Sequence, residues 1–519
     1  MSDPHLYRGR PWDRPLLNPP ELMERLRAAA ARHATRTAIT EVTPRGEPTR
    51  SISYAQLWRD IEERAQRIPS AETGIGGTLA TLVENTIDSL TTVFAIIRAG
   101  AAAVLIDSAE TVERRTEMLA ALACPLVETT DNGKVVLPPA PPRVVTPELA
   151  SPWRTAVVVF TTGSTAASKP VAQSGYSIAV NAEAVARHHR LGVGTTLVCP
   201  LPVSHVNGLE FGIVATLLAG GHAVLVHRFD PLHFVRVLEQ FRATIATTVP
   251  SVLGVMAETR GGSIPAELRY VVSAAAPLHA ATVESLWDRF RLRVVQGYGL
   301  SECMNFATTM PTDLSEADYL ALMTKTEAPP VGSALPGCEV AVLDERDAEV
   351  SEGEIGEVCV RGHSIMTGYL GNPEANAAAL HGGWLRTGDL GRFAAGPDGR
   401  AYLSITGRIK HIAKCGGLGV SLEEIERAVR RLPGVRDACC VSRSHASLGE
   451  AVTLYAVVRG PGEGGTTSAT LRERVATVVD PGRCALRLVL LDELPKLRSG
   501  KPDRVTLAGR ARTGEGVCS

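Results

Sequence analysis

A run of small and hydroxyl-bearing residues at 161–169 ends in a lysine and has the composition of a phosphate-binding loop. Small side chains let backbone N–H groups approach an anion, hydroxyl groups add donors, and the Lys169 ammonium supplies a mobile positive charge. The segment is not a Walker loop, because Ser168 stands where that motif has glycine. A polar surface turn is the alternative. The candidate phosphate ligands are Thr161, Thr162, Gly163, Ser164, Thr165 and Lys169.

Two further segments carry side chains suited to a nucleotide and a metal ion. In residues 296–302, Tyr298 lies between two glycines and can stack a flat ring, while Glu302 can hold Mg²⁺ together with phosphate oxygens. In residues 384–390, we expect Asp389 in a tight turn after a strand, where it can accept hydrogen bonds from both hydroxyls of a ribose. An ordinary glycine turn and an Asx turn are the alternatives.

Two basic segments near the C-terminus complete the set of candidate sites. Arg408 can grip a phosphate or ribose, and the glycines at 416 and 417 leave room for a ligand. Residues 495–504 form a basic loop in which Lys501 is framed by glycine and proline. Such a loop is usually a solvated tail, but this framing indicates a constrained lysine.

The elements that must position these motifs alternate between helix and strand over the first 150 residues. We expect a helix opened by Pro19 and Pro20 that runs to about Arg32, and a second helix over residues 53–68. A strand–helix–strand pattern follows, which is a βαβ unit and implies a parallel sheet. Its three segments are residues 78–82, 88–98 and 102–106.

Short apolar runs after residue 155 predict buried strands, and several of them end at the candidate motifs. They are residues 157–160, 196–199, 223–226, 270–273 and 292–295. Between 339 and 362 short strands alternate with turns, and Asp398-Gly399 predicts a hairpin between Phe393 and Tyr402. This pattern indicates a small β-rich subdomain.

A compact final unit is predicted after a boundary near residues 406–410. Ser421 with Glu424 predicts a capping box that opens a helix to about Arg431. Strands are then expected over residues 438–442, 452–458 and 487–491, with a flexible loop at 460–467. Earlier in the chain, the proline-rich stretch 135–147 predicts a surface connection.

Composition narrows the classes of function. Of the 519 residues, 45% are apolar and 21% are charged, which is typical of a globular protein. A chain of this length is too long for a single hydrophobic core. A net charge of −1 argues against a nucleic-acid or membrane-surface partner. Only seven of the 54 basic residues are lysine, so each lysine deserves a specific explanation.

Neither export nor membrane insertion is expected. The start of the chain lacks a basic stretch followed by an apolar run, and the apolar stretch 90–106 is broken by Arg98 and Gly100. The ten cysteines form no CxxC pair, which favours neither a zinc site nor a disulfide framework. We therefore expect reduced thiols in a cytoplasmic protein.

Taken together, in this order and at these spacings, the five segments resemble the adenylate-forming superfamily, which includes acyl-CoA synthetases, adenylation domains of nonribosomal peptide synthetases and firefly luciferases. The resemblance covers about residues 22–504. Three further segments support it: residues 273–278 look like the family's adenine-pocket turn, 200–209 like its acyl-pocket segment, and 353–370 like its β-barrel segment.

The resemblance implies an α/β fold and a two-step reaction. The fold would comprise an N-terminal domain (residues 1–406) of two αβαβα-type subdomains plus a small β-barrel, and a smaller, mobile α+β C-terminal domain (residues 407–519). A carboxylic acid would react with ATP and Mg²⁺ to give an acyl-adenylate and pyrophosphate. The acyl group would then pass to a thiol, either of CoA or of a carrier phosphopantetheine.

The resemblance also implies roles for individual residues. The loop at 161–169 would hold the β- and γ-phosphates, Ser301 the α-phosphate and Glu302 the magnesium ion. Tyr298 would stack on adenine beside Gly299, Ala275 and Ala276, Asp389 would bind the ribose, and Arg408 would hold ribose or phosphate. Lys501 would bridge the α-phosphate and the attacking carboxylate, Lys410 would form the hinge, and Gly417 would line the pantetheine tunnel.

The substrate is predicted only as a class. Amino-acid-activating relatives place an aspartate early in the acyl-pocket segment, and Asn207 stands near that place here, which favours an aryl or short acyl acid over an α-amino acid. His205 either abuts the substrate carboxylate or forms a pocket wall. The expected pocket residues are His205, Asn207, Phe211, Ser273, Gly299, Cys303, Met304 and Asn305.

Departures from the family pattern leave alternatives open. Ala166 and Ser168 replace a glycine and a proline of the phosphate loop, which puts the strength of ATP binding in doubt, and Leu418-Gly419 replaces a pair that is often polar. Because the chain ends 15 residues after Arg504, we expect no fused carrier domain, so a carrier acceptor would be a separate protein. The remaining alternative is a non-catalytic nucleotide-binding regulator.

Overall fold

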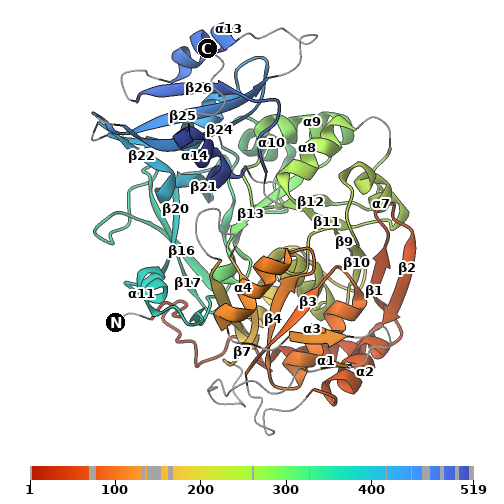
Figure 1. The fold of residues 1–519 in the computed structure, drawn as a ribbon. Helices are drawn as coiled ribbons and strands as arrows, with labels where there is room; N and C mark the ends of the chain where they lie inside the picture. Colours follow the sequence, from red (N-terminus) through yellow and green to blue (C-terminus); the bar gives the residue numbers. More distant parts are fainter. Residues whose placement is uncertain are drawn as a thin grey trace.

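The structure is a computed structural model, and its described residues form four β-sheets with helices packed against them (Figure 1). These residues are 3–68, 77–122, 124, 126–129, 135–136, 153–161, 168–259, 262–326, 328–416, 418–445, 447–458, 468–479, 484–496 and 502–513. The predicted surface connection at 135–147 and the predicted loop at 460–467 lie almost wholly outside them. Among the helices that can be described, none is long and apolar enough to cross a membrane.

A seven-stranded sheet contains the predicted βαβ unit. Its order is β18 (Gly368–Tyr369), β8 (Pro170–Ser174), β7 (Thr155–Phe160), β4 (Ala102–Asp107), β3 (Thr78–Val83), β5 (Leu126–Thr129) and β6 (Val135–Val136). β3 and β4 pair in parallel through α3 (Ile87–Arg98), which confirms the βαβ prediction. Thr86 caps α3, and nearly all of its side chains are buried, so the helix is held by packing on both sides.

A nine-stranded sheet contains most of the remaining predicted strands. Its order is β15 (Ser333–Ala334), β14 (Phe306–Thr309), β13 (Val294–Gly299), β12 (Tyr270–Ser273), β11 (Ile245–Thr248), β9 (Thr196–Cys199), β10 (His222–Val226), β1 (Thr37–Val42) and β2 (Pro48–Ser53). The six strands from β13 to β1 are parallel, and their apolar runs are buried on both faces, as expected for a sheet covered by helices.

Helices cover both of these sheets. They are α1 (Leu22–Arg32), α2 (Tyr54–Ala65), α4 (Val112–Leu122), α5 (Gly175–His188), η2 (Asn207–Ala215), α6 (Thr216–Leu218), η3 (Pro231–His233), α7 (Phe234–Gln240), α8 (Pro250–Glu258), α9 (Ala280–Phe290), η4 (Ser301–Cys303) and α10 (Glu316–Thr324). α2 begins at a capping box formed by Ser53 and Gln56. The predicted start of α1 was wrong: the helix begins at Leu22, because the Glu21 side chain caps the N–H of Glu24.

The end of β13 differs from the sequence prediction in a way that affects the candidate site. The strand expected to end at Val295 continues to Gly299, so the Gly-Tyr-Gly segment lies within β13 and pairs with β14. Gly299 is required by this pairing, since a Cβ atom there would lie 1.5 Å from the Asn305 carbonyl oxygen.

A third sheet forms the small β subdomain. It comprises β16 (Cys338–Leu343), β17 (Gly356–Gly362), β20 (Trp384–Ala395), β19 (Leu380–His381) and β21 (Ala401–Arg408), with α11 (Pro373–Ala379) beside it. The predicted hairpin at Asp398-Gly399 joins β20 to β21 and is confirmed. The tight turn predicted at Asp389 is wrong, because this residue lies inside β20, where the pairing with β17 shifts register and Gly388 has a φ of +70°.

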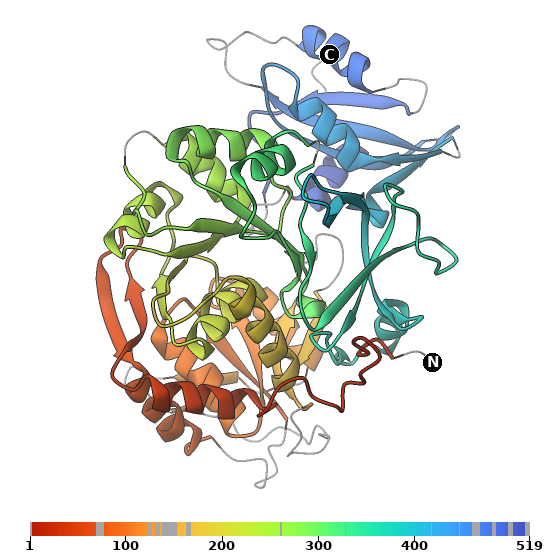
Figure 2. The same ribbon diagram turned by 180° about the vertical axis from the view of Figure 1, so that it is seen from behind.

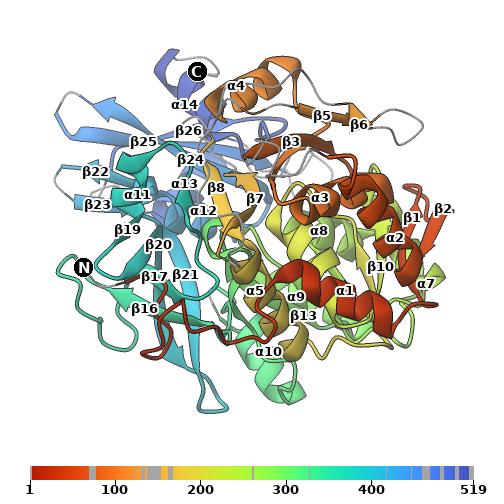
Figure 3. The same ribbon diagram turned by 90° about the horizontal axis from the view of Figure 1, so that it is seen from below.

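The last sheet belongs to the C-terminal part of the chain. Its strands are β23 (Leu418–Ser421), β22 (Ile412–Cys415), β25 (Gly449–Val458), β24 (Val435–His445) and β26 (Leu486–Leu490), and its helices are η5 (Ile409–His411), α12 (Leu422–Arg430), α13 (Ser468–Val478) and α14 (Arg504–Thr513). Ser421 caps α12 by accepting the Glu424 N–H at 3.3 Å, which is one of the two hydrogen bonds of the predicted capping box. Buried residues between Ala413 and Cys484 form a hydrophobic cluster of their own. Figure 3 shows this sheet beside the β subdomain.

The N-terminal arm crosses from α1 to the β subdomain, as Figure 2 shows from behind. The His5 ring contacts the Met366 carbonyl oxygen at 3.0 Å, and the Trp12 indole N–H donates to the His363 carbonyl oxygen at 3.3 Å. The buried Tyr176 hydroxyl contacts His363 Nδ1 at 2.6 Å. The arm therefore helps to fix the segment between β17 and β18, which contacts the candidate site.

Candidate active site

Three of the predicted nucleotide ligands meet around the carboxylate of Asp389. This residue is 2% exposed; its Oδ2 accepts from the Tyr298 hydroxyl at 2.8 Å, and its Oδ1 pairs with Arg408 Nε at 2.6 Å. The pairing of β20 with β21 places Asp389 directly opposite Arg408, and β13 supplies Tyr298. Three separate strands thus bring a carboxylate, a guanidinium and an aromatic ring to one point.

Charge and burial shape the electrostatics of this cluster. Burial and the neighbouring Asp389 carboxylate raise the pKa of Tyr298 well above its usual value, so the phenol stays protonated and can donate. Burial alone would lower the pKa of Arg408, but the combined effects of its neighbours, of which the Asp389 charge is the largest, raise that pKa. A carboxylate has about four acceptor sites. Asp389 therefore has capacity left for two ribose hydroxyls.

A second cluster joins Glu302 and Lys169 through Tyr369. The Tyr369 hydroxyl donates to Glu302 Oε1 at 2.7 Å, and Lys169 Nζ lies 4.7 Å from the centre of the Tyr369 ring. Burial and the Glu302 charge raise the pKa of the Tyr369 phenol. Tyr369 lies in the segment 353–370, which resembles the family's β-barrel segment, and no role was predicted for it. Its contact with both residues depends on the pairing of β18 with β8, which no local pattern reveals.

The backbone around Glu302 is fixed from two directions. Gln173 Nε2, on β8, donates to the Ser301 carbonyl oxygen at 2.6 Å, and the Met366 N–H donates to the Glu302 carbonyl oxygen at 2.8 Å. Fixing the η4 backbone in this way orients the Glu302 side chain before any ligand arrives.

The two ends of the predicted phosphate-binding loop lie together. The Thr161 N–H donates to the Lys169 carbonyl oxygen and the Lys169 N–H donates to Thr161 Oγ1, both at 3.0 Å. Ser168 accepts a hydrogen bond from Arg114 on α4. The other predicted loop ligands, Thr162, Gly163, Ser164 and Thr165, lie outside the described residues, as does Ala166, so their roles stay predictions.

The turn predicted to line the adenine follows β12. Ala275 is exposed and has a φ of +70°, a conformation that costs a non-glycine residue about 1–3 kcal/mol. Ala276 is half-buried. A strained backbone of this kind is typical of ligand sites, and the sequence gives no sign of it.

The predicted acid-pocket residues gather on η2 and on the segment after η4, and most of them are buried. Asn207 is 8% exposed and accepts from the Thr247 hydroxyl at 2.8 Å, and Asn305 is 4% exposed. The Phe211 ring packs between His189 and Phe306. Ser273, Cys303 and Met304 have no exposed surface, whereas His205 is half-buried and Gly299 is the last residue of β13.

Glu210, which the sequence analysis did not select, lies among these residues. Its side chain has no exposed surface, and Oε2 accepts from Asn305 Nδ2 at 2.6 Å, while Oε1 has no hydrogen-bond partner among the described residues. Burial raises the pKa of this carboxyl to about 8, so the neutral form is favoured at pH 7. The bond ties η2 to the segment that carries Tyr298 and Glu302. Met304, the residue before Asn305, has a φ of +66°.

The residues predicted for the hinge, the catalytic lysine and the pantetheine tunnel are only partly described. Lys410 lies in η5, and burial, followed by the neighbouring Arg408 charge, lowers the pKa of its ammonium. Lys501 and Gly417 lie outside the described residues, so their predicted roles stay predictions.

The arrangement fits a magnesium ion that arrives with a nucleotide. Over the described ranges, no group of three or more His, Cys, Asp or Glu residues could form a protein cage for a metal. Glu302 supplies one carboxylate, and Mg²⁺ commonly takes one or two carboxylates with phosphate oxygens and water. The metal would neutralise charge on the polyphosphate when bound.

Two known family models match parts of the chain. The model of the family of AMP-binding enzymes matches residues 26–370, and that of the AMP-binding enzyme C-terminal domain matches residues 424–501. The chain therefore belongs to the AMP-binding enzyme family, which is the adenylate-forming superfamily predicted from the motifs.

Relatives within this family include acid–CoA ligases. The chain is 28% identical to sulfoacetate–CoA ligase of Cupriavidus necator over 388 residues, which cover 75% of this chain and 71% of that protein. ATP-bound MatB from Rhodopseudomonas palustris has a TM-score of 0.81 at 23% identity, covering 95% of this chain and 99% of that chain. O-succinylbenzoate CoA synthetase (MenE) of Bacillus subtilis, bound to ATP and magnesium, has a TM-score of 0.77 at 20% identity, covering 93% and 98%. These structural likenesses confirm the predicted α/β fold.

Proposed function

We propose that the chain is an AMP-forming acid–CoA ligase that activates an aryl or short acyl acid. The observation that carries the proposal is the convergence of separate motifs on two polar clusters, Tyr298–Asp389–Arg408 and Glu302–Tyr369–Lys169. The first has the chemistry to hold a ribose, and the second places a metal-binding carboxylate and an ammonium around one aromatic ring. Membership of the AMP-binding family supports this interpretation.

The proposed reaction has two steps. An oxygen of the acid attacks the α-phosphorus of ATP, the bond to pyrophosphate breaks, and an acyl-adenylate forms. The CoA sulfur then attacks the acyl carbonyl, loses its proton, and releases AMP. Because an anion must attack a polyanion, the cations Lys169, Arg408 and Lys501 would neutralise charge, and the fixed η4 backbone would orient Ser301 and Glu302.

The domain division is part of the proposal. We place the boundary between residues 406 and 407, with the hinge near Lys410. The separate hydrophobic cluster that begins at Ala413 supports this division, since a unit with its own core can turn as a body.

The substrate class follows from the polar groups around η2 and from the relatives. Asn207 and Asn305 suit an acid that bears a ring hydroxyl, an amine or another polar group better than a plain long alkyl chain. Sulfoacetate, a short acid, and O-succinylbenzoate, an aryl acid, are named for two of the relatives and support this class. We propose CoA as the acceptor because the names of both relatives specify it. A separate carrier protein is the alternative.

The acceptor can be tested by product analysis. We expect the protein, ATP, Mg²⁺, CoA and a substituted benzoate or short polar acid to give the acyl-CoA, which mass spectrometry detects. A carrier protein bearing phosphopantetheine is the matched alternative acceptor. An acyl-adenylate that accumulates with CoA but is discharged by the carrier would refute CoA as the acceptor.

A further inference from the structure

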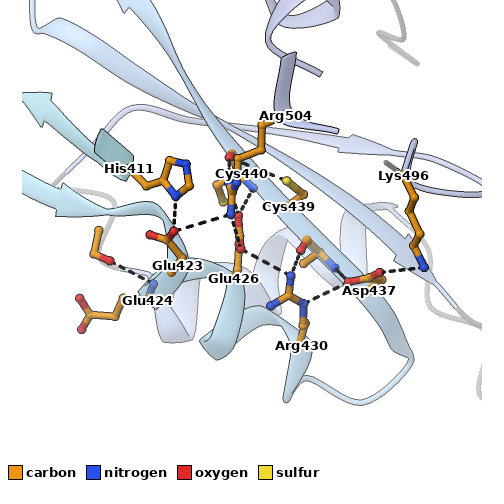
Figure 4. Close-up of polar contacts among 12 residues, drawn as sticks. His411, Glu423, Glu424, Glu426, Arg430, Asp437, Cys439, Cys440, Lys496 and Arg504 are labelled. Atoms are coloured by element: carbon orange, nitrogen blue, oxygen red, sulfur yellow. Dashed lines mark hydrogen bonds and ion pairs between the residues drawn. The ribbon is translucent and has the colours of Figure 1, made fainter. Parts of the chain in front are cut away.

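Five charged side chains before α14 and at its start are linked in a row (Figure 4), and the backbone bridge between Lys496 and Pro502 closes this row into a ring. In the ring, Lys496 Nζ lies 3.9 Å from Asp437 Oδ2, and Asp437 Oδ1 accepts from Arg430 Nε at 3.1 Å. Arg430 Nη2 reaches Glu426 Oε2 at 3.4 Å, and Glu426 pairs with Arg504. The charges come from α12, β24, the residues after β26, and the start of α14.

Glu426 is the centre of this ring. Its side chain is 3% exposed, and both of its oxygens face Arg504, with Nη1 to Oε1 at 2.7 Å and Nη2 to Oε2 at 2.9 Å. The Cys440 N–H donates to Oε1 at 2.6 Å, and Arg504 also donates to the Cys440 carbonyl oxygen. Although burial alone would lower the pKa of Arg504, its attraction to Glu426 raises that pKa. A planar guanidinium forms such a two-point bond, and an ammonium cannot.

The ring holds both flanks of one short segment. Lys496 and Pro502 form an isolated antiparallel bridge, and the Asp503 N–H donates to the Pro495 carbonyl oxygen at 2.8 Å. One flank is anchored to β24 through Asp437, and the other to α12 through Glu426. Lys501, which the sequence predicts as the catalytic lysine, directly precedes Pro502.

The ring also reaches the proposed hinge. Arg504 Nη2 lies 4.0 Å from Glu423 Oε1, and the same oxygen contacts His411 Nδ1. His411 ends η5, one residue after Lys410. One turn further along α12 from Glu423, Arg427 Nη2 donates to the Thr406 carbonyl oxygen at 2.8 Å. One helix therefore contacts both the hinge residues and the anchor of the lysine segment.

We propose that Glu426 and Arg504 are positioning residues, which fix the flank of Lys501 so that this lysine meets the α-phosphate during adenylate formation. The inference rests on the proposed function. Neither residue touches a substrate. A buried carboxylate that holds an arginine at two points gives the defined geometry that a catalytic ammonium needs, whereas an exposed pair would add little.

The test separates the two half-reactions in the full-length protein. Glu426→Gln keeps the shape of the side chain but turns an amide N–H₂ toward an arginine N–H. We expect acid-dependent ATP–pyrophosphate exchange to fall by about 10²-fold, the scale of a catalytic group misplaced by about 1 Å. Formation of acyl-CoA from a supplied acyl-adenylate should stay unchanged. Arg504→Ala should behave in the same way, and Arg504→Lys, which keeps the charge, should retain intermediate exchange.

Leu471→Ala is the matched control. Leu471 lies in the C-terminal hydrophobic cluster with no exposed surface, so this change destabilises the same unit without touching the ring. The proposal is overturned if folded Glu426→Gln exchanges like wild type, or if Leu471→Ala shows the same selective loss at equal stability. If Glu426→Gln does not fold, Arg504→Lys is used in its place. A loss of exchange with thioester formation unchanged supports the proposal, and a wild-type ratio of the two rates overturns it. A wild-type protein without exchange would instead refute the proposed function.

Discussion

Replacing Lys501 by alanine is expected to abolish acyl-adenylate formation while a supplied acyl-adenylate is still converted to acyl-CoA. The proposed role of this ammonium is to bridge two anions as they approach, and removing a single stabilising group of this kind costs about 10²–10³-fold in rate. Acid-dependent ATP–pyrophosphate exchange measures the first half-reaction, and thioester formation from the adenylate measures the second. The loss should therefore be confined to exchange.

Two substitutions sharpen the Lys501 prediction. Lys501→Arg keeps the charge but replaces a compact ammonium with a planar fork, so exchange should stay low. Lys325→Ala removes another lysine, an exposed one at the end of α10, and should leave both half-reactions unchanged. Exchange that persists in Lys501→Ala would show that this lysine is not the bridging group.

Replacing Glu210 by glutamine is expected to stabilise the protein increasingly as the pH rises. A glutamate with a pKa of about 8 in the folded state and 4.5 in the unfolded state binds more protons when folded between these values. The free energy of unfolding therefore falls through this range and levels off above about pH 8. The total corresponds to roughly 4–5 kcal/mol from this one buried group. Glutamine cannot ionise, so the variant should lack this loss.

The readout for Glu210 is the pH dependence of the difference between variant and wild type, measured by denaturant unfolding. The unpaired amide N–H₂ of glutamine adds a cost of about 1–3 kcal/mol that does not vary with pH. At pH 4.5 the variant should thus be less stable than wild type by about this cost. Toward pH 8 the difference in the free energy of unfolding should shift in favour of the variant. Glu316→Gln, at an exposed position on α10, is the control. A difference that stays constant with pH would contradict the burial-raised pKa.

The sequence predicted the parallel sheets well because their strands are continuous apolar runs bounded by turns. β9 and β12 match their predicted ranges, and the hairpin at Asp398-Gly399 follows from its turn residues. Asp389, which follows Gly388, was expected in a tight turn after a strand. That glycine instead accommodates a register shift inside β20, which depends on the partner strand β17.

The residues that the sequence analysis missed depend on long-range contacts. Tyr369 meets Glu302 only because β18 pairs with β8, and Glu210 meets Asn305 across 95 residues. In the same way, Glu426 lies in an amphipathic helix and reads as one more surface charge until α14 folds against β24. Family motifs mark residues that contact ligands, whereas the buried polar partners of those residues carry no local pattern.

The lysines illustrate how composition and structure agree. Lys169 lies against Tyr369 beside Glu302, Lys410 lies in η5, and Lys496 belongs to the ring that anchors the segment of Lys501. An arginine-rich chain thus has lysines at the predicted phosphate-binding loop, the proposed hinge and the proposed catalytic segment, where a compact and flexible ammonium suits the chemistry.

The central claim, that this chain activates a carboxylic acid as an adenylate, is tested most directly by ATP–pyrophosphate exchange. The protein is incubated with ATP, Mg²⁺ and labelled pyrophosphate, and aryl, short acyl, long alkyl and α-amino acids are added one at a time. We predict exchange that depends on the acid and is strongest with polar aryl or short acyl acids. No exchange above the acid-free background with any acid, from a protein that binds ATP, would contradict the claim and indicate a nucleotide-binding regulator.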